Sequence, residues 1–166
     1  MKRLILIFLL LLPLFACTQN LDFLDAKTGF REFNFGQEYN LINEKFNQIH
    51  FAVSIGEKKF YEKSNENLQF GELTASKIQY IFLNNIFVGY SITFKGVDEY
   101  NIVSEILTGM YGIPTGGHWK GKINNCMLSM VPKNSGMGMN TMISFSNEVA
   151  WVAASQKSSK HNKSGF

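Results

Sequence analysis

The stretch Lys77–Lys95, KIQYIFLNNIFVGYSITFK, decides the fold, because it contains two apolar runs separated by Asn84 and Asn85. Runs rich in β-branched and aromatic residues around a turn-forming pair are typical of an antiparallel hairpin. A two-residue turn puts apolar side chains on both faces of the hairpin, so a single buried face favours a three-residue loop. That loop aligns three residues of one strand with three of the other: Phe82, Tyr80 and Ile78 with Ile86, Val88 and Tyr90.

Two helices are predicted on either side of this hairpin. After it, Asp98 is a suitable N-terminal cap, apolar residues follow at helical spacing, and Gly112 and Pro114 end the pattern. Before it, a second set of apolar residues at helical spacing predicts a shorter helix near residues 37–46. The segments Glu38–Glu44 and Glu99–Glu105 are similar in sequence, which suggests two related strand-helix units.

Further strands are predicted wherever apolar and polar residues alternate between turn signals. They cover residues 30–35, 48–55, 58–63, 122–131 and 139–146, with 148–154 as a candidate for another. We therefore predict one α+β domain, in which an antiparallel twisted sheet has the helices near 37–46 and 98–111 packed on one face. A closed β-barrel is the alternative architecture.

The first sixteen residues are organised as an export signal. Lys2 and Arg3 precede the apolar run Leu4–Leu12, which is shorter than the roughly 20 residues of a membrane-spanning helix. Ala16 supplies the small residue that precedes a cleavage site. We predict that residues 1–16 form a signal peptide that is removed.

The tetrad Leu14-Phe15-Ala16-Cys17 resembles the lipobox of bacterial prolipoproteins, although Phe15 is bulkier than the residue most common at its position. In that family a diacylglyceryl group is attached to the cysteine thiol, and the signal is cut just before the cysteine. The resemblance implies lipidation of Cys17, with two or three acyl chains that anchor the protein to the membrane without spanning it. The alternative is an ordinary secretory signal in which Cys17 is incidental.

The residue after the cysteine bears on the destination of the protein. In Gram-negative lipoproteins an aspartate at this position favours retention in the inner membrane, and this chain has Thr18. The resemblance therefore implies the outer membrane, with the domain facing the periplasm. We expect residues 17–29 to be the lipidated cysteine and a tether, residues 30–154 the domain, and residues 155–166 a disordered polar tail.

Charge argues against a nucleic-acid partner. The chain has sixteen basic residues, and subtracting five (Lys2, Arg3, Lys157, Lys160 and Lys163, which lie in the signal or the tail) leaves eleven against thirteen acidic ones. Nucleic-acid binding needs a clustered basic surface, which a mildly acidic domain does not offer. We expect the partners to be the membrane, through the lipid anchor, and an envelope protein that the sequence does not identify.

The segment Gly116–Lys122, GGHWKGK, contains most of a phosphate-binding P-loop. Ile123 follows where a serine or threonine should bind magnesium, and the segment comes after a helix instead of a strand. We therefore expect no nucleotide and interpret the segment as a Gly-rich surface loop, with Trp119 at the edge of the domain.

Other candidate chemistry is weak. His50, His118 and His161 are scattered, so no metal or other cofactor is expected. Cys126 alternates with apolar residues in a predicted strand, which favours a buried, inert thiol over a nucleophile. Five methionines come late in the chain, and core filling is favoured over an adaptable binding surface: Met127, Met130, Met137, Met139 and Met142.

The sequence favours a non-enzymatic envelope lipoprotein that binds another protein or supports an assembly. The alternative is a carrier of small molecules or lipids, with aromatic side chains lining a cavity between sheet and helices. A third class, an envelope hydrolase, requires His50 or His118 to lie close to an acid or to Cys126. The second half loosely resembles small uncharacterised bacterial lipoproteins, in Phe82–Phe87, Tyr111–Pro114 and Trp119, and this likeness bears on the fold alone.

Overall fold

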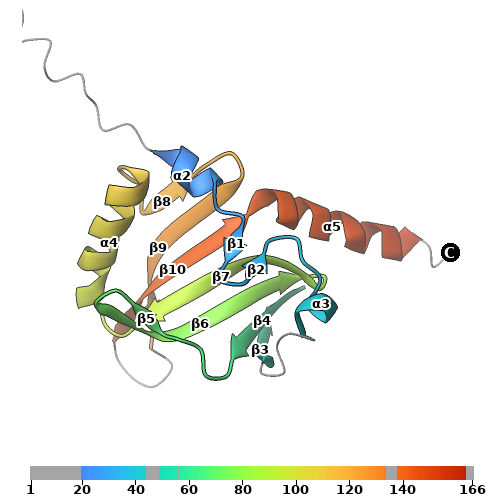
Figure 1. Ribbon diagram of the computed structural model, residues 1–166, viewed down its shortest axis with the longest axis horizontal. Helices are drawn as coiled ribbons and strands as arrows, with labels where there is room; N and C mark the ends of the chain where they lie inside the picture. The colour runs from blue at the N-terminus through green and yellow to red at the C-terminus, as the bar shows by residue number, and fades with distance from the viewer. Residues whose placement is uncertain (1–19, 44–48, 56, 134–137, 164–166) are drawn as a thin grey trace, which may run out of the picture.

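The computed structural model describes residues 20–43, 49–55, 57–133 and 138–163 (Figure 1). Its main feature is an eight-stranded antiparallel sheet with the strand order β3-β4-β6-β7-β10-β9-β8, in which β5 pairs with β6. The strands are β3 (Ile49–Ile55), β4 (Lys58–Lys63), β5 (Gln69–Phe70), β6 (Leu73–Leu83), β7 (Ile86–Phe94), β8 (His118–Lys120), β9 (Asn124–Pro132) and β10 (Met139–Asn147). The α+β class is confirmed, and the sheet is open, with β3 and β8 at its edges.

The central hairpin forms where it is predicted, but its turn is different. Leu83 pairs with Ile86, so Asn84 and Asn85 alone make the turn, with φ values of 49° and 63°. Asparagine tolerates this left-handed backbone better than most residues, and such a turn matches the twist of the strands. The predicted three-residue loop is wrong. Leu83, Ile86 and Val88 pack together on one face of the hairpin. A β-bulge beyond the Phe82–Phe87 pair shifts the register and brings Tyr80 opposite Tyr90, so that these four rings lie on the other, larger apolar face.

That apolar face is covered by α3 (Tyr39–Asn43), α4 (Asp98–Tyr111) and the N-terminal segment (Figure 1). The ring of Tyr39 stacks on that of Tyr61 at 4.6 Å, and Val103 of α4 is buried in the same core. Both predicted helices therefore lie on one face, as expected. The first is shorter than predicted, and residues 44–48 lie outside the described part of the chain.

The opposite face is covered at one end by α5 (Glu148–Lys163), whose residues Ala150 and Ala154 pack against Val88. The strand considered for 148–154 is wrong, and so is the disordered tail as far as residue 163. A local signal explains the helix: the Asn147 side chain accepts a hydrogen bond from the N–H of Ala150, as a helix cap does.

Residues 20–35 fold against the sheet. They form α2 (Leu21–Asp25), β1 (Gly29–Phe30) and β2 (Phe33–Asn34), and Leu24 is fully buried. The predicted tether is therefore wrong over residues 20–29, which belong to the domain. The hypothesis of two related units is not supported either, because α3 follows β2 of a small two-stranded sheet, whereas α4 follows β7 at the centre of the large one.

Candidate functional site

An apolar pocket of about 340 Å³ lies between α4 and the sheet, beside the turn that joins β5 to β6. Its lining includes Phe70 and Leu73 at that turn, Ile92 and Phe94 of β7, and Val103 and Ile106 of α4. None of its nine lining residues has a polar side chain. Ligand pockets typically have volumes of roughly 300–1,000 Å³ and mostly apolar walls. The pocket therefore suits the binding of an apolar group and offers no group for acid–base catalysis.

The regular spacing of apolar residues along α4 and β7 places the walls of this pocket. Val103 and Leu107, one helical turn apart on α4, point at the sheet and are 2% and 7% exposed, whereas Ile106 is 48% exposed. Ile92 and Phe94 are two residues apart on β7 and therefore lie on the same face of the sheet. The centre of the Phe70 ring is 6.2 Å from the centre of the Phe94 ring. The pocket thus has a floor of buried side chains, and the exposed Ile106 and the β5–β6 turn lie at its mouth.

A polar groove of about 560 Å³ lies on the opposite face of the sheet. Lys77, Lys95 and Lys133 line it together with polar residues such as Gln79 and Asn140, and no carboxylate is among its described lining residues. Part of its polar surface is used within the fold, because Asn140 accepts a hydrogen bond from the N–H of Gly96. Around the C-terminal end of β7 the two faces of the sheet therefore differ in chemistry, one being apolar and the other polar and basic.

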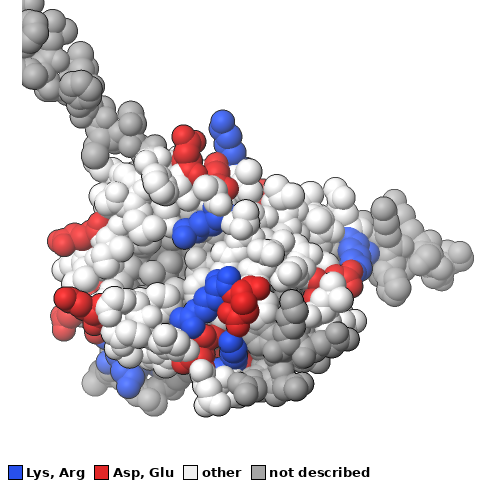
Figure 2. Space-filling model, viewed as in Figure 1, with Lys and Arg blue, Asp and Glu red and all other residues white. Residues whose placement is uncertain are grey.

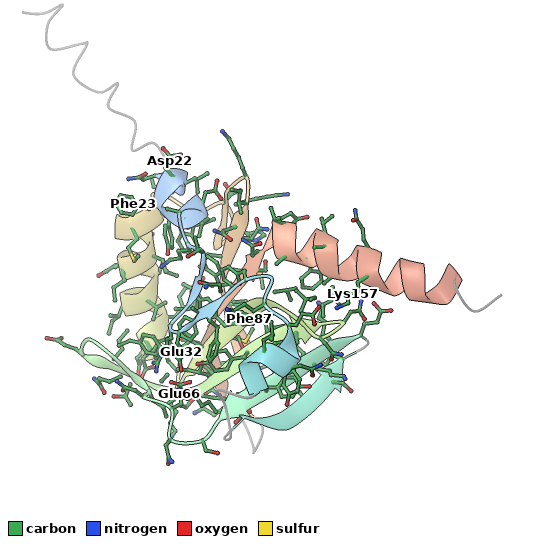
Figure 3. All side chains as sticks on the ribbon, turned by 45° about the vertical axis from the view of Figure 1, so that its right-hand side comes forward. Asp22, Phe23, Glu32, Glu66, Phe87 and Lys157 are labelled. Carbon is green, nitrogen blue, oxygen red and sulfur yellow. The ribbon has the colours of Figure 1, made fainter. Side chains whose placement is uncertain are left out.

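A cluster of charged groups joins the N-terminal segment to the sheet. Figure 2 shows these groups in the middle of a largely uncharged surface, and Figure 3 labels Glu32 and Glu66 there. Arg31 pairs with Glu66, whose side chain is 6% exposed, and Glu66 accepts a hydrogen bond from the Tyr80 hydroxyl. Burial and the contact with Glu66 raise the pKa of Tyr80 far above its usual range. Tyr80 therefore stays protonated and keeps this bond, which is a structural role.

Asp25 at the end of α2 holds the loop between β8 and β9. Its carboxylate accepts hydrogen bonds from the backbone N–H groups of Lys122, Ile123 and Asn124 at 2.8, 2.9 and 2.9 Å. Burial on its own raises the pKa of Asp25, but these hydrogen bonds and the charge of Lys122 outweigh it, and the pKa lies below its ordinary value. The side chain of Asn124 also donates to the carbonyl of Leu24. Together these bonds fix α2 on the sheet.

Of the residues singled out in the sequence, His118 and Cys126 lie on neighbouring strands, β8 and β9. Cys17 lies outside the described residues. Cys126 is 1% exposed, and burial raises its pKa to about 12, so the predicted buried thiol is confirmed. His50 lies in β3 and His118 in β8, the two opposite edge strands, and His161 lies in α5. His50 pairs in register with Glu62 of β4, and His118 is the neighbour of Trp119, which pairs with Cys126. The exposed His118 and the buried Cys126 lie on opposite faces of the sheet, so these two do not form the pair that a cysteine hydrolase requires.

The Gly-rich segment forms a turn and then a strand. Gly116 and Gly117 have φ values of 58° and 75°, and β8 begins directly after them. A P-loop would instead lead into a helix. Trp119, predicted at the edge of the domain, is fully buried, and its indole N–H donates to the carbonyl of Gly112. The buried indole thus fixes the end of α4 on β8.

Of the five methionines late in the chain, four lie among the described residues, and none of the four is buried in the core, contrary to expectation. Met127, Met130 and Met139 are 40%, 50% and 36% exposed, Met142 lines the polar groove, and Met137 lies outside the described residues. Strand alternation explains part of this, because Met127 lies on the face of β9 opposite the buried Cys126 and Leu128.

The structure is thus an α+β domain with an apolar pocket between α4 and the sheet. No protein-family model matches the chain, and no curated protein or solved structure matches it either. Among the described residues, none of the helices combines the length and the hydropathy needed to cross a membrane.

Proposed function

We propose that the chain is a lipid-anchored, non-enzymatic binding protein of the bacterial cell envelope. Cys17 carries the anchor in the outer membrane, the domain faces the periplasm, and the apolar pocket takes an apolar group such as an acyl chain. The lipobox-like tetrad before Thr18 supports the anchor. The observation that carries the binding role is a pocket of about 340 Å³ whose lining has no polar side chain.

The anchor predicts that labelled fatty acid is attached at one residue. Cells producing the full chain should incorporate radioactive palmitate into it, and the Cys17→Ser variant should incorporate none, because serine lacks the thiol that accepts the diacylglyceryl group. Autoradiography of the immunoprecipitated protein is the measurement. Equal labelling of the two proteins would contradict the anchor, and Cys126→Ser is the control, because that thiol is buried.

The pocket predicts a difference between two similar substitutions on α4. Ile106 and Ile102 are each 48% exposed and lie one turn apart, but Ile106 lines the pocket and Ile102 does not. A carboxylate at the apolar mouth is costly to desolvate, so Ile106→Asp should weaken binding of a fluorescent fatty acid by roughly tenfold or more. Ile102→Asp should leave binding within about twofold of the parent.

That binding is measured by fluorescence titration on residues 17–166 produced with serine at position 17, so that no acyl chain of its own competes. Equal affinities of the two variants, or no saturable binding by the parent protein, would count against an apolar ligand in this pocket. Melting temperatures of both variants show whether the fold is intact.

A second candidate function is docking of an envelope protein on α4. Ile102, Ile106 and Met110 recur every four residues along the helix and are 48%, 48% and 42% exposed, which makes one apolar row. In this case Ile102→Asp and Ile106→Asp should both remove a protein that is crosslinked to α4 in intact cells. The two functions are therefore distinguished by Ile102→Asp, which affects only protein docking.

A further inference from the structure

We propose that the end of the domain formed by α2, the C-terminal end of α4 and the β8–β9 turn lies against the bilayer, with Phe23 inserted among the lipid headgroups. This inference rests on the proposed lipid anchor and adds to it an orientation and a membrane-contacting surface. Figure 1 shows α2, β8 and one end of α4 at the same end of the molecule. We call this part of the surface the α2 end.

The first reason is the length of chain between the anchor and the domain. Only residues 18 and 19 separate Cys17 from Asn20, which is the residue just before α2. An extended chain spans at most roughly 3.3–3.6 Å per residue, so the Cα atoms of Cys17 and Asn20 are at most about 11 Å apart. The polar headgroup layer on each side of a bilayer is about 5–8 Å thick. An anchored Cys17 therefore holds the start of α2 in or against that layer.

The second reason is that α2 is fixed to the domain and cannot serve as additional tether. Leu24 is fully buried in the core, and the three backbone hydrogen bonds accepted by Asp25 hold the β8–β9 turn. The side chain of Asn124 adds a bond to the carbonyl of Leu24. The position of α2 at the membrane therefore sets the position of the whole domain.

The third reason is the chemistry of the α2 end. Phe23, Ile113 and Ile123 are 65%, 58% and 40% exposed, and they lie in α2, just after α4 and in the β8–β9 turn, which are the segments of the α2 end. Figure 3 shows Phe23 and Asp22 on α2, at the point where the chain enters the domain. Aromatic side chains are favoured at the depth of the headgroups, so a membrane is a suitable partner for this surface.

The charged residues of the α2 end also suit contact with a membrane. Lys120 and Lys122 are exposed in and beside the β8–β9 turn, Asp22 is the exposed acid of α2, and the Asp25 carboxylate is already occupied by backbone N–H groups. Lysine side chains near an anionic bilayer surface are attracted to it. The apolar pocket is lined by the middle of α4 and by residues in and after β5, so it is not part of the α2 end.

The test uses the full, lipidated protein reconstituted in vesicles of phosphatidylethanolamine and phosphatidylglycerol. A nitrobenzoxadiazole label is attached at Phe23→Cys or, in a second variant, at Ile113→Cys, and the matched control is Glu72→Cys, an exposed residue in the β5–β6 turn. Neither native cysteine should react, because Cys17 is acylated and Cys126 is buried. Phospholipids with nitroxide near the headgroup should quench the labels at 23 and 113 at least about twofold more than the label at 72.

Two different failures can be told apart by the mass of the reconstituted protein. If Cys17 is acylated and the labels at 23, 113 and 72 are quenched equally, the membrane-contacting surface is wrong and the anchor stands. If the mass shows no acyl chain, the proposed function fails and the orientation fails with it. Because Phe23 and Ile113 are exposed, their replacement should leave the melting temperature unchanged, and two label sites guard against a local effect at either one.

Discussion

Replacing Asp25 with alanine is expected to lower the free energy of unfolding by roughly 3 kcal/mol. A hydrogen bond to a charged group contributes about 1.5–3 kcal/mol, and three such bonds that share one carboxylate are not additive. The substitution also leaves the N–H groups of Lys122, Ile123 and Asn124 without this acceptor. Urea denaturation of the mature chain, followed by circular dichroism, measures the difference.

Two matched variants separate this contact from a general effect of charge. Asp25→Asn retains one oxygen, which can still accept from Ile123 and Asn124, so its loss should be intermediate. Asp22→Ala removes an exposed acid from the same helix and should change stability by less than about 0.5 kcal/mol. If Asp22→Ala is as destabilising as Asp25→Ala, the hydrogen bonds of Asp25 are not the cause.

The same contact predicts a dependence on pH. A carboxyl group whose pKa is lowered in the folded state stabilises the fold fully above its unfolded pKa, which is about 4, and loses this contribution as the pH falls through the lowered value. Stability should therefore fall more steeply below about pH 4 in the parent protein than in Asp25→Ala. Parallel pH profiles would contradict this role.

Replacing Gly89 with alanine is expected to be at least as damaging, with a loss of about 3 kcal/mol or more. Gly89 lies in β7 between β6 and β10, and an added Cβ would be 2.3 Å from the carbonyl oxygen of Phe145. Backbone of a central strand cannot move away as a flexible side chain can, so the sheet must distort. The measurement is the midpoint of urea or thermal unfolding.

Gly109→Ala in α4 is the control for this substitution. A Cβ at Gly109 meets nothing within 4 Å, and alanine is a better helix former than glycine, so this variant should be more stable by about 0.5–1 kcal/mol. Opposite signs for the two glycine substitutions are the expected result. A Gly89→Ala protein with unchanged stability would show that β7 and β10 are not as closely packed as described.

Local patterns in the sequence predict most of the elements but not how they pair. The strands 48–55, 58–63, 122–131 and 139–146 are found to within two residues, and the helix at 98–111 is found at its predicted bounds. The hairpin register is missed because it depends on a β-bulge in β7, where Gly89 approaches β10, and that contact is distant in sequence. The helix after Asn147 is missed because an apolar run of this length fits a strand as well as a buried helix segment.

The candidate site is harder to predict because its parts are far apart along the chain. The inner row of α4 is visible from helical spacing, but the wall that Phe70 and Leu73 supply comes from the stretch 64–76, which is mostly polar in sequence. Asp25 falls within the predicted tether, and its structural role is not visible in the sequence because its three partners lie almost one hundred residues further on. Only the folded chain brings them together.

The identity of the mature N-terminal residue tests the central claim most directly. Tryptic digestion of the purified mature protein should give an N-terminal peptide covering residues 17–27, CTQNLDFLDAK. Mass spectrometry should find this peptide with a diacylglyceryl group on the Cys17 thiol, and with or without a further acyl chain on its amine. An unmodified cysteine at this position, or a peptide that still contains residues of the signal, would contradict the lipid anchor.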